Sequence, residues 1–209
     1  MNLEFVYKIL DEKEWSQAKE ITKYYESLPF TLNDASGSQK VLVLEDEDGI
    51  YFGFINFQDE ETIRVQKHQR DDEMANADMV GVSIDFDGDG LLSYGFSISA
   101  GGSILDNVVR NENEVNYDWD SDWGHGVSIG KDVWYAEMFI PWSVAPMKAQ
   151  KGDKRRVRLS FYRWIVSKYK VHSTIKGNAM TEKFMSIFNE YEFNNYDVSK
   201  IDYFPYVNL

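Results

Sequence analysis

Two tryptophans lie among three aspartates in a loop-like stretch that reads YDWDSDWG from residue 117 to 124. An indole ring offers a flat, apolar face and loses little rotamer freedom on binding, while a neighbouring carboxylate accepts hydrogen bonds from hydroxyl groups. Trp119 and Trp123, with Asp120 between them, are therefore candidate binding residues for a ligand with apolar faces and hydroxyl edges. The alternative is that one or both rings pack the loop onto the edge of the fold.

A second polar cluster comprises Arg70, Asp71 and Asp72. Arginine offers five donors in a fixed geometry and carboxylates supply acceptors, so this combination suits recognition of a polyol. The cluster is thus a second candidate for ligand contacts. The alternative is an internal salt bridge that ties a loop to a sheet.

The third candidate is an acidic loop with the spacing D-x-D-x-D-G, formed by Asp85, Asp87 and Asp89 before Gly90. Carboxylates at alternate positions can converge on one calcium ion, so a structural calcium site is predicted here. However, the twelfth position of the loop is Phe96, where an EF-hand needs a bidentate glutamate. The alternative is an acidic β-turn in which Asp and Gly serve the turn geometry.

The remaining residue types argue against catalysis. The chain has no cysteine, which excludes disulfides, thiolate metal sites and cysteine nucleophiles. His68, His125 and His172 are scattered without the spacing of a zinc site. No nucleophile elbow, P-loop or dinucleotide-binding motif occurs, and nothing singles out one carboxylate pair among many. We therefore expect a protein that is not an enzyme.

The net charge of the chain limits which macromolecules can be its partners. The formal net charge of −13 opposes nucleic acid and anionic membranes, because binding a polyanion would add repulsion. No apolar run approaches the ~20 residues of a spanning helix, so we expect no direct insertion into a membrane.

The N-terminus also lacks the apolar core of a secretory signal. Either the protein is cytoplasmic or a signal has been removed. We expect a monomer.

The periodicity of the chain indicates strands. Runs with strand character cover residues 3–9, 41–44, 50–57, 79–86, 94–99, 127–129, 133–140, 155–164 and 184–188. Residues 11–28 instead have apolar positions every three or four residues and are predicted to form a helix that Pro29 ends. Residues 107–117 are expected to form a loop or an irregular edge. The fold class is therefore all-β.

Seven or more short strands separated by turn signals are typical of an antiparallel two-sheet β-sandwich. We predict a jelly-roll-like sandwich with one short N-terminal helix. The whole chain, residues 1–209, is predicted to be a single domain with its core at about residues 3–190. Residues 191–209 are interpreted as a tail.

An ordered set of motifs resembles a family-9 carbohydrate-binding module, or a near relative in the DOMON-like sandwich group. The resemblance covers roughly Glu12 to Trp164. The motifs are Glu12-x-x-Trp15; the hairpin VLVLEDEDGIYFGFINFQD; Arg70-Asp71-Asp72; DMVGVSID at residues 78–85; Tyr94-Gly95-Phe96 with a Gly101-Gly102 turn leading to Asp106; Trp119-Asp120-x-x-Trp123; and Trp134-x-x-Glu137 followed by Ile140-Pro141-Trp142.

The resemblance implies a β-sandwich without catalysis, a sugar end-group held between aromatic rings, and structural calcium. On this interpretation the partner is an oligo- or polysaccharide, stacked on Trp119 and Trp123 and hydrogen-bonded by Arg70, Asp71 and Asp120. The tail at residues 204–207 resembles the junction that, in some bacterial surface proteins, precedes a larger membrane region. This implies a periplasmic, extracellular or cell-surface location, while a cytoplasmic location stays open.

Two other functions stay open. Some DOMON-like sandwiches bind haem b through a methionine and a histidine or lysine and carry electrons; Met74, Met79, Met138 and His125 are the residues that would allow this. The third hypothesis is a structural or interaction domain of a larger outer-membrane protein, without a small ligand. The identity of the glycan is not encoded in any motif found here.

Overall fold

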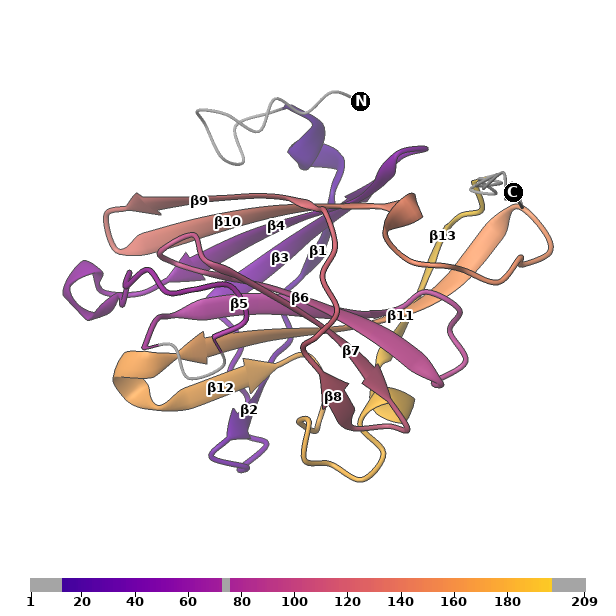
Figure 1. Cartoon of the computed structure of the whole chain (residues 1–209). Coiled ribbons are helices and arrows are strands. Elements are labelled where there is room, and N and C mark those ends of the chain that lie inside the picture. The colour runs from indigo at the N-terminus through magenta and orange to yellow at the C-terminus, as the bar shows by residue number, and fades with distance from the viewer. Residues whose placement is uncertain (1–12, 73–75, 197–209) are drawn as a thin grey trace, which may run out of the picture.

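A computed structural model describes residues 13–72 and 76–196 of the chain. Two antiparallel sheets pack face to face, which confirms the predicted all-β sandwich (Figure 1). The smaller sheet has five strands in the order β1-β3-β4-β10-β9. Their bounds are β1 (Lys19–Ile21), β3 (Gln39–Glu45), β4 (Gly49–Phe57), β10 (Val133–Pro141) and β9 (Gly124–Gly130).

The larger sheet has eight strands, and seven of them follow the order β2-β12-β11-β5-β6-β7-β8. The eighth, β13, pairs with the first half of β11, whereas β12 pairs with its last four residues. The bounds are β2 (Tyr25–Leu28), β12 (Lys170–Ser173), β11 (Lys154–Ile165), β5 (Met79–Asp85), β6 (Leu92–Ser99), β7 (Ile104–Arg110), β8 (Glu114–Asn116) and β13 (Asn189–Asn194).

The predicted N-terminal helix over residues 11–28 is wrong. Its described part contains only a short 3₁₀ turn, η1 (Lys13–Gln17), followed by β1 and β2. These two strands pair with β3 and β12, so they join opposite sheets. Of the apolar residues whose spacing suggested a helix, only Trp15 is buried, and Ala18, Ile21, Tyr25 and Leu28 are half-buried. The β-branched and aromatic residues of this segment suit strand pairing. Tertiary pairing has overridden the local pattern.

Other boundaries also differ. Residues 107–117, expected to form a loop or an irregular edge, include most of β7 and all of β8, the short strand at the edge of the larger sheet. Residues 184–188, expected to be the last strand, contain the turn η5 (Met185–Ile187), and the strand β13 begins only after it. The boundary predicted at residue 190 falls inside β13. The strand predicted at residues 3–9 lies outside the described residues. The remaining 3₁₀ turns are η2 (Glu60–Thr62), η3 (Trp142–Val144) and η4 (Val166–Lys168).

The core lies between the two sheets and is rich in aromatic rings. Phe52 and Phe54 of β4 meet Phe161 of β11 edge-on, with ring centroids 5.5 and 6.1 Å apart. Val157 and Leu159 precede Phe161 on the same face of β11 and are fully buried. Residues 155–164, predicted to be a strand, lie within β11, and its alternation leaves the opposite face of this strand pointing away from the smaller sheet.

At one end of the sandwich the two sheets are joined by a buried arginine. Arg163 of β11 is 1% exposed. Its Nη1 donates to the Ser38 carbonyl (2.6 Å) and to Gln39 Oε1 (3.2 Å), at the start of β3. Its Nη2 donates to the Phe57 carbonyl (3.2 Å) and to Gln58 Oε1 (2.7 Å), at the end of β4. One side chain from the larger sheet thus satisfies four acceptors of the smaller one.

The charge of Arg163 is balanced through a neighbour. Gln58 Nε2 donates to the buried carboxylate of Asp78 (2.7 Å), so an amide lies between the guanidinium and the nearest negative charge. Burial lowers the pKa of Arg163 to about 10, although the charge of Asp78 acts to raise it. Arg163 therefore stays charged at neutral pH. We refer to Arg163, Gln39, Gln58 and Asp78 as the Arg163 cluster.

Replacing Arg163 with methionine should lower the free energy of unfolding by about 3 kcal/mol or more, because it leaves buried acceptors without their donor and removes the positive charge near the buried carboxylate of Asp78. Arg158 is the matched control. It lies on the same strand and donates to exposed Glu190 (3.1 Å), so Arg158→Met should cost below ~1 kcal/mol. Urea denaturation of both variants checks this, and equal losses would contradict the role given to Arg163.

Candidate functional site

Arg70 and Asp106 form the centre of the predicted polar cluster. Asp106 of β7 is fully buried, and Arg70 Nη2 donates to both of its carboxylate oxygens (2.8 and 2.7 Å). The same Nη2 donates to the Ser121 carbonyl (3.0 Å), and the Ser121 N–H donates to Asp106 (2.9 Å). Arg70 and Asp106 therefore attach the tryptophan loop to β7. Sequence reasoning did not identify Asp106 as a member of this cluster.

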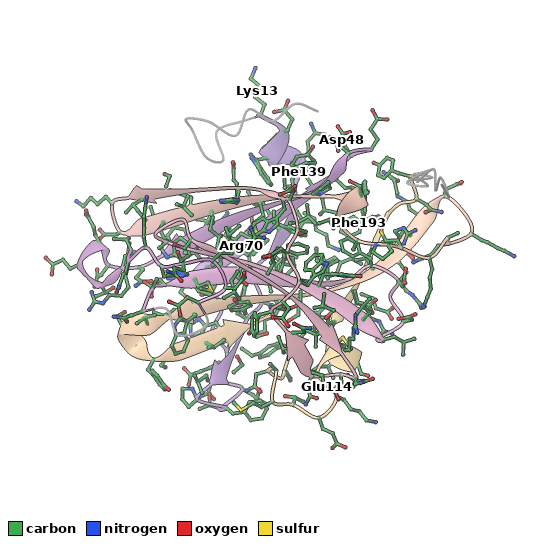
Figure 2. The ribbon with its side chains drawn as sticks, in the orientation of Figure 1. Lys13, Asp48, Arg70, Glu114, Phe139 and Phe193 are labelled. Carbon is green, nitrogen blue, oxygen red and sulfur yellow. The ribbon has the colours of Figure 1, made fainter. Side chains whose placement is uncertain are left out.

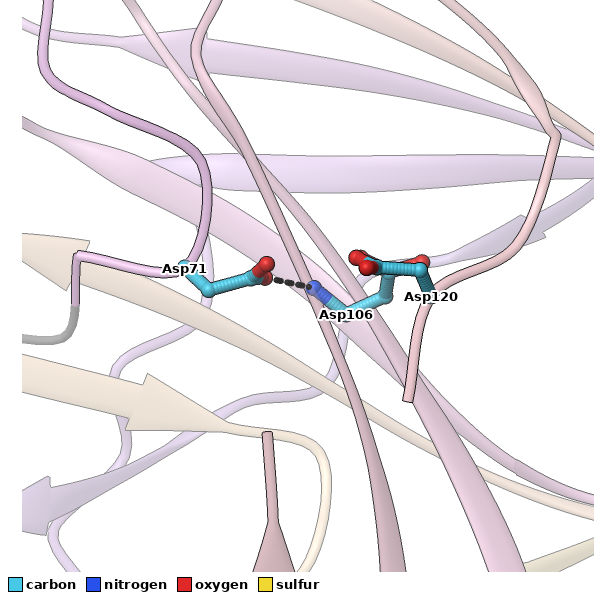
Figure 3. Close-up of side chains that lie close together, drawn as sticks. All are labelled: Asp71, Asp106 and Asp120. Carbon is cyan, nitrogen blue, oxygen red and sulfur yellow. Dashed lines mark hydrogen bonds between the residues drawn. The ribbon is translucent and has the colours of Figure 1, made fainter. Parts of the chain in front are cut away.

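Asp71 and Asp120 complete the cluster (Figure 3). The carboxylate of Asp71 accepts the backbone N–H of Asp106 (2.9 Å), and Asp120 lies 2.8 Å from Arg70 Nε. The three carboxylates converge, with an oxygen of each within 4.8 Å of the others. Burial raises the pKa of Asp71, whereas the hydrogen bond and charge of Asp106 raise the pKa of Arg70 against the effect of its own burial.

The structure thus brings Arg70, Asp71 and Asp120 together, as a ligand site would require. Their hydrogen bonds, however, are made largely to one another and to the loop, which is the geometry of the internal salt bridge. An open hollow of about 250 Å³ lies beside them, lined by Arg70, Asp120, Ser121 and Asp122. The label in Figure 2 marks where Arg70 lies.

The two loop tryptophans pack inward. Trp123 is 8% exposed and meets Phe96 edge-on at 5.6 Å. Trp119 is half-buried, with its ring 4.9 Å from Tyr94 and 5.9 Å from Phe96. Neither ring lines the hollow beside Arg70. Their contacts are those of the alternative interpretation, in which the rings fix the loop to the edge of the sandwich, and only Trp119 keeps substantial exposed surface.

The acidic loop after β5 directs its carboxylates to protein donors. Asp85 accepts the N–H groups of Gly88 and Gly90, both at 2.8 Å, and so shapes the turn. Asp87 accepts the backbone N–H of Lys148 (2.8 Å), and Asp89 pairs with the Lys148 ammonium. A calcium ion at this loop would have to displace that ammonium. Calcium therefore stays a prediction.

A groove that sequence reasoning missed lies on the outer face of the larger sheet. Its volume is about 300 Å³, and strands β5, β6, β7, β11 and β12 contribute to its lining. Figure 1 shows β8, at the edge of the larger sheet, and the segment that precedes β13 on the side away from the smaller sheet, and residues of both line the groove. Glu114 of β8 accordingly lies on the opposite side of the molecule from Phe139 of β10 (Figure 2).

Cross-strand register explains the shape of the groove. Ser160 of β11 pairs with Ser83 of β5, which pairs with Gly95 of β6, which pairs with Asn107 of β7. Residues in register across a sheet point to the same face, so these four form one transverse row. Small residues dominate the row, and the sheet surface is therefore low enough there to leave a groove. We call this the Ser83 row.

Glycine is required at position 95 of the Ser83 row. A Cβ atom there would lie 2.6 Å from Asn107 Oδ1 and 2.8 Å from Nδ2, so the amide of Asn107 lies across Gly95. In the next row a glycine is again covered by a large side chain, because a Cβ on Gly81 would lie 2.3 Å from the ring of Tyr162. The hydroxyl of Tyr162 then donates to Ser97 Oγ (2.7 Å). The two glycines let large polar side chains lie flat along the groove.

Three polar groups of the Ser83 row are open. The side chains of Ser83, Ser160 and Asn107 make no hydrogen bond within residues 13–72 and 76–196, and all three line the groove. Polar groups this close to a core normally have partners, so open donors and acceptors are available to a ligand. The sequence carries a weak signal for them. Small residues alternate with apolar ones in VGVSID, YGFSIS and LSFYR, opposite the core-facing positions.

The residues proposed for haem are divided between the two sheets, although His125 of β9 and Met138 of β10 are cross-strand partners. Met79 belongs to β5 in the larger sheet, and Met138 belongs to β10 in the smaller sheet, where it is buried in the core. His125 is exposed on β9. Met74 lies outside the described residues. The haem hypothesis therefore stays a prediction.

No protein-family profile matches the sequence, and no curated protein matches it either. Several solved structures share its fold, among them the following three. A Bacteroides uniformis protein with an ascribed carbohydrate-binding role has a TM-score of 0.65 at 12% identity, over 86% of this chain and 88% of that chain. A family-9 carbohydrate-binding module from Caldicellulosiruptor kristjanssonii in complex with glucose has a TM-score of 0.55 at 13% identity, over 88% of each chain.

The third structure is a family-9 module from the same organism in complex with cellotriose. Its TM-score is 0.53 at 12% identity, over 93% of this chain and 92% of that chain. The chain described here therefore has the fold of a family-9 carbohydrate-binding module, as its motifs suggested. The relation to DOMON-like sandwiches stays a prediction. Within the described ranges, no helix has the length and apolar character needed to cross a membrane.

Asp106→Asn should lower the free energy of unfolding by roughly 1–3 kcal/mol, because a neutral amide would replace the buried acceptor of Arg70 and Ser121. Asp120→Asn is the control. Its carboxylate also contacts Arg70 but is 67% exposed, so its removal should cost less than ~1 kcal/mol. Urea denaturation followed by tryptophan fluorescence measures both. A larger loss for Asp120→Asn would contradict the assignment of Asp106 as the main anchor of the loop.

Proposed function

We propose that this domain binds carbohydrate in the groove on the outer face of the larger sheet. The observation that carries the proposal is the Ser83 row, which presents two hydroxyls and an amide without partners among the described residues. The fold adds support, because two proteins that share it were solved with glucose and cellotriose. Binding involves no catalysis, and the ligand is an oligo- or polysaccharide or its end-group.

The mechanism follows from the geometry of the row. Neighbouring strands are ~4.8 Å apart, so Ser160 and Ser83 present hydroxyls at one strand spacing and Asn107 lies two strands further. Hydroxyls both donate and accept, and the amide of Asn107 offers separate donor and acceptor atoms, which suits an array of sugar hydroxyls. Tyr162 and Phe184 provide aromatic surface for the C–H faces of a sugar ring.

A second location follows from the tryptophan loop. There Trp119, with Trp123, would stack on a sugar, and Arg70, Asp71 and Asp120 would bind its hydroxyls. Partial exposure of Trp119 and the hollow beside Arg70 support this location. The groove is favoured because the side chains of Ser83, Ser160 and Asn107 make no hydrogen bond within residues 13–72 and 76–196, whereas Arg70 and Asp106 are already paired.

Location and oligomeric state are two further properties that we propose for the domain. We place the domain outside the cytoplasm, in the periplasm or at the cell surface, as a monomer that binds glycan without entering the membrane. An interaction domain of a larger outer-membrane protein is the competing function. It predicts that a folded, colourless protein binds no glycan.

Asn107→Ala should weaken the binding of the best ligand from a glycan array by about tenfold, because one side chain loses a donor and an acceptor. Ser83→Ala should weaken it roughly threefold. Ser128→Ala, at an exposed position of β9, is the control and should bind normally. Titration calorimetry measures the affinities. Normal binding by Asn107→Ala together with loss of binding by Trp119→Ala would move the site to the tryptophan loop, and a blank array would refute carbohydrate binding.

Calcium at the acidic loop is proposed as a structural addition, and Lys148 provides its test. Millimolar calcium should raise the melting temperature relative to EDTA, since a ligand of the folded state stabilises it. Lys148→Met removes the competing ammonium from Asp89, so the shift should be larger in that variant. Equal melting temperatures with calcium and EDTA in both proteins would exclude a calcium site in this loop.

A further inference from the structure

We infer that the groove selects a neutral sugar that carries a methyl group, such as a 6-deoxyhexose. This inference rests on the proposed function and concerns the class of ligand for the same groove. Two features carry it: the groove has no charged lining, and one of its walls is apolar.

None of the groove-lining residues among those described is Asp, Glu, Lys, Arg or His. In the chain as a whole, 27% of residues are charged. A uronate or an amino sugar would give up part of its hydration in this groove without gaining an opposite charge, which is unfavourable. The net charge of −13 adds repulsion for any anion. The ligand that fits is therefore uncharged.

The apolar wall faces the open end of the Ser83 row. Leu105 and Val109 of β7 and Val115 of β8 line the groove, together with Met180 and Phe184 of the covering segment. The part of this wall formed by Val109 and Phe184 is anchored, because Val109 belongs to a buried cluster with Ile175, Met185 and Phe188, against which Phe184 packs. Met180 is 83% exposed. A fixed apolar wall beside a polar row matches a ligand with one polar face and one methyl-bearing edge.

A hydroxymethyl group fits this wall poorly. Its hydroxyl would lie among aliphatic and aromatic carbons without a hydrogen-bond partner, whereas a methyl group would bury apolar surface at the same place. Pocket discrimination of this kind typically amounts to a factor of about ten or more. The groove is also small, at about 300 Å³, which is the lower end of the range for ligand pockets and favours one or two sugar units.

Matched pairs of sugars test the inference directly. L-Fucose and L-galactose differ only by the 6-hydroxyl, as do L-rhamnose and L-mannose. Calorimetric titration of the whole chain should give at least one 6-deoxy sugar an affinity about tenfold or more above its partner. D-Glucuronate should bind more weakly than D-glucose at both low and high salt. Equal affinities within both pairs, or preferred binding of the uronate, would overturn the inference while leaving carbohydrate binding intact.

A variant links the preference to the wall. Val115→Thr keeps the shape of the side chain but adds a hydroxyl, and Val115 is exposed enough for the fold to tolerate the change. The ratio of affinities within a pair should fall several-fold. Val65→Thr, at an exposed site outside the groove, should leave the ratio unchanged. An unchanged ratio in Val115→Thr would overturn the role of this wall, whereas failure of every sugar to bind would refute the proposed function itself.

Discussion

The alternation of side chains along β11 is the constraint on which the rest of the structure depends. Val157, Leu159 and Phe161 point into the core, while Ser160 and Tyr162 point to the groove. A shift of one residue in the register of this strand would exchange the residues on its two faces. The same register therefore determines both the core and the lining of the candidate site. The Arg163 cluster fixes that register, because only one position along β11 can supply four hydrogen bonds to the smaller sheet.

Much of the sandwich could be predicted from period-two patterns and turns. The hairpin of β3 and β4, the pair β5 and β6, and the hairpin of β9 and β10 follow the expected ranges closely. The segment of residues 11–28 could not be predicted, because its partners β3 and β12 lie far away in the sequence and in different sheets. Local spacing carries no information about which layer buries a given residue.

Local sequence patterns were also insufficient to identify the candidate sites. Trp119 and Arg70 are predicted to bind a ligand because of their residue types. The structure assigns them contacts that hold a loop to the sandwich. The groove depends on serine and glycine, whose meaning comes only from the neighbours across the sheet. A serine on one strand can be recognised as part of this site only when the strand register is known, because the register places it in line with an open amide three strands away.

Gly95 illustrates how a position without a side chain can carry specificity. Any residue with a Cβ at this position would displace the amide of Asn107, so it would alter the groove without approaching the ligand. Positions 95 and 107 should therefore be inherited as a unit among related sequences. A lineage that loses the glycine is free to lose the asparagine, and such a pair of changes would mark the point at which one ligand was exchanged for another.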